Sequence, residues 1–475
     1  KIIKNITLGF DPSLFTYKQL NIYFKKSIKL KPINKNLIDE IYNSRKLKNK
    51  SFYSLNDKIV GESTKSKINK IVNVLKKNKS DYIFISAPEN VAWTLNIRGY
   101  DNPNSPVPNS RLIIGQNKKI YLIAEKKKVS KIISNGKINK KQIVNPKKFS
   151  NLIHSLKGNK FIIDSISCSV LNENIIRSKF KIINKNDPCY NFKSVKNSTE
   201  INRMEKAHVE DGVALTKFIY WMKNKKKTNL SEIDAQNKLE KFRKLNNNYL
   251  FPSFNTIAGT GSNGAIVHYR ATKKSNKIIK RKDIFLCDSG GQYNYGTTDV
   301  TRTLCFDRQP ISIRNIFTKV LKGHIAVFNT NLSKFDVGEK IDIRARKFLK
   351  QDGLDYAHGT GHGVGFFLNV HEGPQAISKF NRVKIKEGMI ISNEPGFYKK
   401  NHFGIRIENL IYVKKFKQKL FFKNLTLAPI DKDLINYDLL NKDEKNYLFK
   451  YHLEVYSKLS KYLDYNEKKW LISLL

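Results

Sequence analysis

The stretch HGTGHGVGFFLNVHEG at residues 358–373 constrains the fold of this chain more than any other feature. It gathers three of the nine histidines of the chain and interleaves them with glycines. His358 and His362 are four residues apart, but the glycines between them exclude the regular helix that a His-Glu-x-x-His zinc motif requires. The stretch therefore predicts non-helical backbone, in which glycine lets the chain approach a metal ion or a substrate closely.

Two aspartates lie in neighbouring β-like runs. Asp288 in IFLCDSGGQY and Asp299 in GTTDVTRT are 299 − 288 = 11 residues apart. Each lies at or beside the end of its run, and the GGQYNYG between them has the composition of a turn. A hairpin of this size can set both carboxylates on one face.

Two glutamates follow later in the chain, Glu394 in ISNEPGFY and Glu408 in GIRIENLIYV. In the second stretch, strand alternation puts Arg406 and Glu408 on one face and Ile405 and Ile407 on the other. A strand that points an arginine and a glutamate inward is typical of a lined cavity, because buried charges must be paired. Any one of these acids alone is more often a surface residue, but their joint occurrence beside β-like runs indicates a site.

These four carboxylates and the imidazole of His362 would repel one another strongly if they converged without a cation. Two divalent ions neutralise such a cluster, since carboxylates can bridge metals about 3.5–4 Å apart. Ligation dominated by oxygen, with a single nitrogen, favours Mn²⁺ or Co²⁺ over a sulfur-rich structural zinc site. The residues therefore predict a dinuclear metal site.

Composition argues against several other classes of protein. A chain of 475 residues is expected to hold two or three domains, and it has no run of about 18 apolar residues that would indicate a membrane span. The net charge of +49 comes from lysines scattered along the whole chain, which favours solvated basic faces over a nucleic-acid partner. The four cysteines form no C-x-x-C pair, which fits a reducing cytoplasm.

Apolar periodicity divides the chain into two regions. From residue 51 to residue 195, a basic helix at 66–78 precedes the strand-like runs YIFIS, RLIIG, KIYLIA and KFIID, which predicts a mixed sheet with helices. A capping box of Asn197 and Glu200 opens a long helix, and Ser231 with Asp234 opens another. Further helices are predicted at 315–328, 339–351 and 442–474.

Taken together, these motifs resemble those of a known family. The stretches NVAWTLNIRGYDNPNSPV, NGAIVHY, DSGGQYNYGTTDVTRT, GLDYAHGTGHGVGFFLNVHEGP, NEPGFY and FGIRIENL, with LAPIDKDLI and KYHLEVY near the end, resemble the long cytosolic form of aminopeptidase P (Xaa-Pro aminopeptidase), of the creatinase/prolidase metallopeptidases. The resemblance implies an α/β (α+β) fold, with a C-terminal pita-bread catalytic domain preceded by a creatinase-like mixed-sheet domain. It divides the chain into a remnant of a first creatinase-like domain (1–50), a second such domain (51–195), the dinuclear metallopeptidase domain (196–415) and a C-terminal extension (416–475).

The resemblance also implies a role for each site residue. Asp288 would bind one metal ion, Asp299 and Glu408 would bridge both, and His362 and Glu394 would complete the second. His268, His358 and His371 would line the substrate site, with His358 near the metals without being a ligand. Glu394 would act as general base and then acid, His371 and His268 would donate to the oxyanion, and Arg406 would hold Glu394 or the substrate. One departure is HYRAT at residues 268–272, where the family usually has HYAP.

The implied activity is removal of the N-terminal residue from peptides with proline in second position, by a hydroxide that bridges two divalent ions. Mn²⁺ is expected, with Co²⁺ or Zn²⁺ as alternatives, in a cytoplasmic homodimer with peptide substrates and no nucleic-acid or membrane partner. Two alternatives stay open: a prolidase-like dipeptidase restricted to X-Pro dipeptides, and a metal-free pita-bread relative that binds histones, RNA or peptides. Creatine hydrolysis is disfavoured by the matches toward both ends of the chain.

Overall fold

The computed structural model describes residues 6–24, 27–33, 35–42, 50–224 and 229–475. These residues form two compact units, Lys1–Lys193 and Ser194–Leu475. Part of the expected remnant at 1–50 lies outside the described residues. The described part of that segment holds two parallel strands and two short helices: β1 (Thr7–Phe10), α1 (Tyr17–Tyr23), β2 (Lys29–Pro32) and α2 (Leu37–Ile41).

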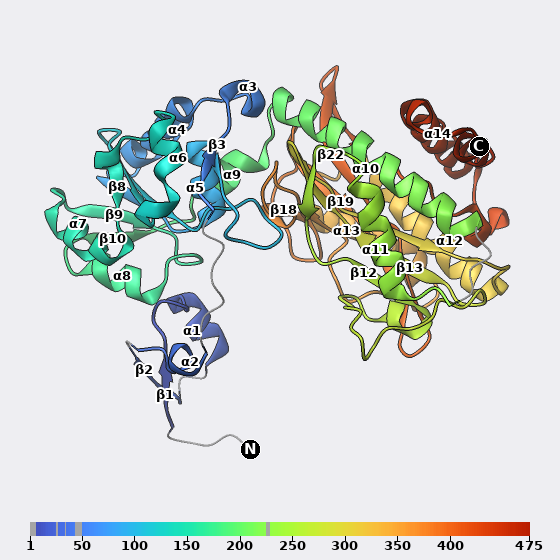
Figure 1. Ribbon diagram of the computed structural model, residues 1–475, viewed down its shortest axis with the longest axis horizontal. Coiled ribbons are helices and arrows are strands. Elements are labelled where there is room, and N and C mark those ends of the chain that lie inside the picture. Colours follow the sequence, from blue (N-terminus) through green and yellow to red (C-terminus); the bar gives the residue numbers. More distant parts are fainter. Residues whose placement is uncertain (1–5, 25–26, 34, 43–49, 225–228) are drawn as a thin grey trace. The chain divides into compact units, whose positions relative to one another are not determined.

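The rest of the first unit is built on a six-stranded mixed sheet, ordered β10-β9-β4-β6-β7-β8. Both faces are buried, because consecutive residues such as Ile83, Phe84 and Ile85 are all shielded from solvent, and Figure 1 shows helices around the strands. The elements are β3 (Tyr53–Ser54), α3 (Asp57–Val60), α4 (Thr64–Lys77), β4 (Tyr82–Ile85), α5 (Pro88–Leu95), β5 (Ile97–Arg98), β6 (Arg111–Gly115), β7 (Ile120–Ile123), α6 (Ser130–Ser134), β8 (Ile143–Val144), α7 (Phe149–Ser155), β9 (Lys160–Ile163), α8 (Val170–Arg177), β10 (Lys181–Asn184) and α9 (Cys189–Ser194). The predicted mixed sheet is confirmed, and each of the four strand-like runs supplies one strand.

The second unit contains a three-stranded and a five-stranded antiparallel sheet, each covered by helices. Helices α10 (Ser198–Asn224) and α11 (Glu232–Arg243) pack on β12 (Ile257–Thr260), β13 (Phe285–Ser289) and β16 (Val300–Leu304) through a shared apolar core. Helices α12 (Ile311–Phe328) and α13 (Gly338–Lys350) contribute to the core over the larger sheet, ordered β18-β17-β19-β22-β23. Its strands are β17 (Gly361–Gly363), β18 (Glu372–Ile377), β19 (Ile390–Asn393), β22 (Asn409–Phe416) and β23 (Lys419–Asn424).

Shorter strands connect these sheets. They are β11 (Tyr249–Pro252), β14 (Gly291–Tyr293), β15 (Gly296–Thr297), β20 (Gly396–Lys399) and β21 (Phe403–Arg406). Strands β13 and β16 pair antiparallel with Asp288 opposite Thr301, as the predicted hairpin requires. The intervening β14 and β15 belong to another sheet, ordered β11-β14-β15, so the connection is longer than a simple turn.

Local capping signals place the helix starts. The backbone N–H groups of Asn197 and Glu200 each bond the other residue's side chain at the start of α10, and Ser231 with Asp234 does the same for α11. The single helix expected at 442–474 is wrong: it divides into α14 (Lys442–Leu459) and α15 (Tyr465–Ile472). The break arises because Asp464 forms its own capping box and starts a new helix.

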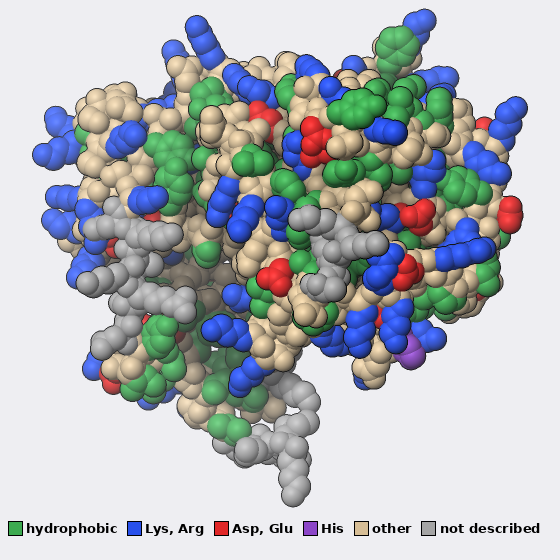
Figure 2. All heavy atoms as spheres, turned by 45° about the vertical axis from the view of Figure 1, so that its right-hand side comes forward, with side chains coloured by type: hydrophobic (Ala, Val, Ile, Leu, Met, Phe, Trp, Pro, Cys, Tyr) green, Lys and Arg blue, Asp and Glu red, His purple; other side chains and the backbone are tan. Residues whose placement is uncertain are grey.

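Surface and cysteine features agree with the sequence. Figure 2 shows lysine and arginine side chains spread over the face in view rather than gathered in one patch. All four cysteines are buried and none is in a disulfide. Among the described residues, no helix is both long and apolar enough to cross a membrane.

Candidate active site

A cavity of about 450 Å³ in the second unit contains every residue that the sequence singled out for chemistry. Its wall includes His268, Asp288, Asp299, His358, His362, His371, Glu394, Arg406 and Glu408. The wall also includes residues that sequence reasoning missed, namely Phe254, Asn255, Ile257, Val267, Tyr269 and Arg270. The predicted site residues therefore converge, although they come from segments up to 140 positions apart (408 − 268).

The acids come from the ends and junctions of strands in both sheets. Asp288 lies on β13, and Asp299 directly precedes β16. Glu394 directly follows β19, while Glu408 lies between β21 and β22. Residues at strand ends can turn into a cavity without interrupting the sheet. His362 faces the same cavity from the middle of β17, in the larger sheet.

Strand alternation in GIRIENL places side chains as the sequence predicted. Ile405 and Ile407 are fully buried in the apolar core. Arg406 and Glu408 lie on the cavity wall instead. The regular strand ends at Arg406, yet the alternation persists through Glu408.

The potential ligand atoms form overlapping groups. Within each of two groups, Asp288–Asp299–Glu408 and His362–Glu394–Glu408, all ligand atoms lie within 4.8 Å of one another. A third such group joins Asp299, His362 and His371. The His362 Nε2 atom lies 3.4 Å from an Asp299 oxygen and 3.5 Å from a Glu394 oxygen. Because Glu408 and Asp299 each belong to two groups, the arrangement offers two adjacent cation positions with shared carboxylates.

Electrostatics of the cluster favour bound cations. Burial, followed by the nearby Asp288 carboxylate, raises the pKa of Asp299 well above its usual value. Burial and then Asp299 do the same to the pKa of Glu408, and burial raises the pKa of Glu394. One oxygen of Asp288, Oδ1, is buried without a hydrogen-bond partner. The donor set therefore fits a pair of divalent ions, which would satisfy that oxygen and cancel the mutual repulsion.

Arg406 is the buried cation of this wall. Its guanidinium donates to Asp288, to the Tyr398 hydroxyl and to Thr301 Oγ1, at 2.5, 2.5 and 3.0 Å. These bonds hold Asp288, and the expected role of Arg406 in holding Glu394 or the substrate stays a prediction. Tyr398, which also lies 2.9 Å from His358 Nε2, was missed by sequence reasoning. Its one signal was its place in the motif NEPGFY.

Two histidines of the cavity have lowered pKa values. Burial lowers the pKa of His358 to about 4. Burial, followed by the neighbouring His362, lowers the pKa of His371 to about 4. His371 packs edge-on against His362, with ring centroids 4.2 Å apart, and His268 also lies on the wall. The Nδ1 atom of His358 lies 2.7 Å from the Gly359 carbonyl oxygen, which can only accept, so the single N–H of a neutral His358 donates there. A neutral His371 keeps one N–H that can donate to a substrate oxygen.

The glycines of the histidine stretch also allow close packing of strands. A side chain on Gly361 would meet the carbonyl oxygen of Ser392 at 1.9 Å, and one on Gly363 would meet that of Glu372 at 2.3 Å. These glycines are needed because β17 lies tightly between β19 and β18. These glycines therefore serve strand packing. Gly359 and Gly361 also line the cavity, and the access that they would give to a metal ion or a substrate stays a prediction.

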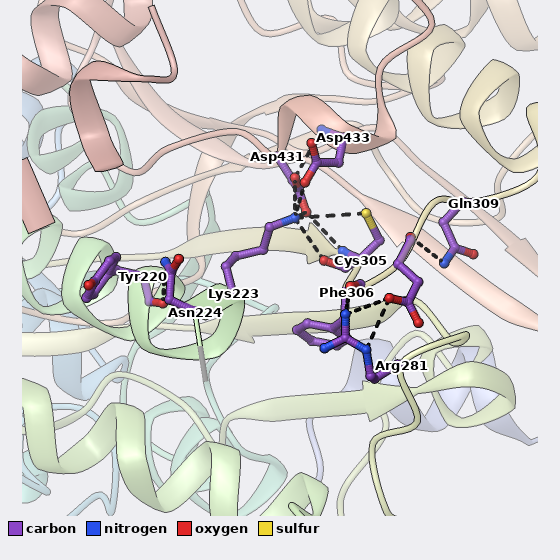
Figure 3. Close-up of polar contacts among 10 residues, drawn as sticks. Tyr220, Lys223, Asn224, Arg281, Cys305, Phe306, Gln309, Asp431 and Asp433 are labelled. Atoms are coloured by element: carbon purple, nitrogen blue, oxygen red, sulfur yellow. Dashed lines mark hydrogen bonds and ion pairs between the residues drawn. The ribbon is translucent and has the colours of Figure 1, made fainter. Parts of the chain in front are cut away.

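A second group of potential ligands lies elsewhere in this unit. The ligand atoms of Cys305, Asp431 and Asp433 are within 4.8 Å of one another. Figure 3 shows the Lys223 side chain reaching into this group, with its Nζ 2.9 Å from Asp431 and 2.7 Å from Asp433. The ammonium group already supplies the positive charge, so this cluster is an internal ion pair and not a metal site.

Three family models match consecutive parts of the chain. Metallopeptidase family M24 matches residues 202–415, the creatinase/prolidase N-terminal domain matches 43–200, and the C-terminal region of peptidase M24 matches 418–473. The cluster of acids thus lies in the part of the chain that matches the metallopeptidase, and the fold is a creatinase-type N-terminal domain followed by a pita-bread domain.

More specific relatives narrow the assignment. The chain is 35% identical to a probable Xaa-Pro aminopeptidase P from Pyrenophora teres f. teres, over 96% of this chain and 74% of the relative. A relative of the same description from Laccaria bicolor is also 35% identical, over 96% and 73%. The chain therefore belongs to the Xaa-Pro aminopeptidase P family of M24 metallopeptidases, as its motifs indicated.

Solved structures agree on the fold. X-prolyl aminopeptidase from Caenorhabditis elegans, described as a cytosolic enzyme with a di-nuclear active site, superposes with a TM-score of 0.92 at 29% identity, over 100% of this chain and 81% of that one. Prolidase from Pyrococcus furiosus superposes with a TM-score of 0.60 at 25% identity, over 75% and 98%.

Proposed function

We propose that this chain is a dinuclear metal-dependent Xaa-Pro aminopeptidase, which releases the first residue from peptides with proline in second position. The observation that carries the proposal is the pair of overlapping ligand groups that share Glu408, inside one substrate-sized cavity. The names of the relatives and the di-nuclear site of the structural neighbour support it.

Five side chains would hold the ions: Asp288, Asp299, His362, Glu394 and Glu408. When bound, two divalent ions supply Lewis acidity that polarises the scissile carbonyl and makes water a nucleophile near neutral pH. We propose Mn²⁺, with Co²⁺ or Zn²⁺ as alternatives, because four of the five ligands are oxygen donors.

The protein's own groups would move the protons and place the peptide. Glu394 would take the proton of the attacking water and pass it to the departing prolyl nitrogen. Ser392 Oγ, which donates to a Glu394 oxygen at 3.1 Å, would restrain that carboxylate during the transfer. His371 and His268 would donate to the carbonyl oxygen as negative charge develops on it. Arg406 would keep Asp288 oriented from behind.

The decisive experiment is hydrolysis of Arg-Pro-Pro and of Gly-Pro by metal-stripped protein, before and after addition of Mn²⁺. Release of arginine only after metal addition supports the proposal. Cleavage of Gly-Pro alone would instead assign a prolidase-like dipeptidase. Absence of cleavage in both states, with no metal retained, would assign a metal-free binding protein.

Other attributes complete the proposal. We propose the domain limits 1–50, 51–195, 196–415 and 416–475, a homodimer, and a cytoplasmic location like that stated for the structural neighbour. Light scattering of the purified chain would test the homodimer.

A further inference from the structure

Arg270 lies on the wall of the active-site cavity, two residues beyond His268. Its side chain is exposed. It forms no ion pair with any carboxylate in the part of the chain that the structure describes. A guanidinium on the wall of this cavity that pairs with no carboxylate of the protein can pair with a carboxylate of a ligand.

The other arginine of the wall is already paired with a carboxylate of the protein. Arg406 is 2% exposed and donates to Asp288. Arg270 and Arg406 are the only lysine or arginine residues among the described residues of this wall, so Arg270 is the permanently charged side chain that remains available to a ligand.

The backbone that carries Arg270 is held in place by a buried acid. Glu232 is fully buried, and its carboxylate lies 2.8 Å from the Tyr269 hydroxyl and accepts from the Asn263 side chain at 3.0 Å. It also accepts from the backbone N–H of Lys277 at 3.0 Å, at the far end of the same loop. These bonds fix the backbone on both sides of Arg270. Because this segment is already ordered, less conformational entropy is lost when Arg270 binds a ligand.

We propose that Arg270 binds a carboxylate of the peptide substrate and gives the site a preference for anionic peptides. This inference rests on the proposed function. A planar guanidinium recognises a carboxylate through two parallel N–H···O bonds, and an ammonium group cannot reproduce that geometry. The carboxylate has two sources, the free C-terminus of a short peptide or an acidic side chain, and the chemistry of recognition is the same for both.

A matched peptide series separates these sources. The probes are Ala-Pro-Ala-amide, Ala-Pro-Ala with a free C-terminus, Ala-Pro-Glu-amide and Glu-Pro-Ala-amide, assayed with the Mn²⁺-loaded full chain. The measured quantity is kcat/KM of each acidic peptide divided by that of the neutral amide. We expect a ratio of roughly three to ten in at least one arm. The arm with the highest ratio identifies the source of the carboxylate.

Variants then assign the preference to this side chain. Arg270→Ala is expected to bring the ratio close to one, and Arg270→Lys to retain part of it. The matched control is Lys274→Ala, which removes one positive charge from the same loop outside the cavity wall. A ratio that falls equally in Lys274→Ala would assign the preference to diffuse charge and overturn the proposal. A ratio near one in the unmodified protein, or one unchanged in Arg270→Ala, would also overturn it.

A binding measurement keeps this inference separate from the proposed function. If the unmodified protein cleaves none of the peptides, the proposed function fails. Calorimetric titration of the same four peptides then gives ratios of Kd in place of kcat/KM. Tighter binding of an acidic peptide that disappears in Arg270→Ala supports the role of Arg270, and equal affinity for all four peptides contradicts it.

Discussion

The Nη2 atom of Arg406 lies 2.5 Å from the Oδ2 atom of Asp288, with exposed side-chain fractions of only 2% and 11%. The other oxygen of Asp288 is buried and has no hydrogen-bond partner. One oxygen is therefore fixed by a guanidinium, while the other is presented toward the cluster of acids. This arrangement orients a carboxylate for a cation before any cation binds.

Arg406→Lys should weaken catalysis by losing that orientation. The three nitrogens of the guanidinium donate to Asp288, Tyr398 and Thr301, and the single nitrogen of a lysine ammonium cannot make all three hydrogen bonds at once. We expect kcat/KM to fall by roughly 10- to 100-fold, the equivalent of one lost hydrogen bond to a charged group. Tyr398→Phe is the matched control, because it keeps the pair with Asp288 and should cost less. Wild-type kcat/KM in Arg406→Lys would contradict this role.

Asp299→Asn should act in opposite directions on activity and on metal-free stability. Mutation of a residue that only orients a metal ligand lowers metal affinity or activity by about 10- to 100-fold. Asp299 belongs to two of the ligand groups, so Asp299→Asn should lower activity by more than about 100-fold and should reduce the amount of bound metal. In the presence of a chelator, the variant should melt at a higher temperature than the unmodified protein, because it carries one fewer buried negative charge. Elemental analysis and thermal melts measure both effects. A variant that keeps full metal content and activity would remove Asp299 from the site.

The stability of the protein should fall as the pH drops below about 6.5. Burial lowers the pKa of His452 to about 4 from a model-compound value of 6.5, and its Nε2 accepts a hydrogen bond from the Ile430 N–H. The unfolded chain then binds a proton between pH 6.5 and pH 4 that the folded chain does not, so stability is full above this window and is lost through it. The loss from this group is on the order of 3 kcal/mol.

Denaturant titrations at pH 7 and pH 5 measure this slope. His452→Gln should reduce the fall in the free energy of unfolding between pH 7 and pH 5. His154→Gln, at an exposed histidine of the first unit, should leave that fall unchanged. A slope identical in His452→Gln and in the unmodified protein would show that His452 does not contribute.

Lys223→Met should destabilise the second unit strongly. It would leave Asp431, whose side chain is 3% exposed, without the ammonium that neutralises it. Breaking such a pair from one side costs about 3–5 kcal/mol. Arg281→Met is the matched control, because Arg281 and Asp307 are both largely exposed and such pairs contribute at most about 1 kcal/mol.

Denaturant titration with and without a chelator tests this account. The cost of Lys223→Met should be the same in both conditions, because a lysine occupies this cluster. Equal, small costs in the two variants would disprove the buried ion pair, and a chelator-dependent cost would indicate a metal there.

Local sequence patterns predicted much of the fold and the identity of the site residues. The capping box of Asn197 and Glu200 set the start of α10, because it involves groups only three residues apart. Alternation in GIRIENL assigned Ile405 and Ile407 to the core, since successive strand side chains point to opposite faces. The same local logic did not place the break within residues 442–474, where α14 ends at Leu459 and the capping box of Asp464 begins α15.

The amino-acid sequence by itself determined which side chains are candidates for the chemistry, through residue type, short-range periodicity and family motifs. Only the tertiary structure decided their partners. Asp288 meets Arg406 from 118 positions away, and Lys223 meets Asp431 from 208 positions away. It also showed that Gly361 serves strand packing and that Arg270 faces the cavity without an acidic partner. The physical reason is range: periodicity and caps act within a few residues, whereas these contacts depend on how separate sheets pack together.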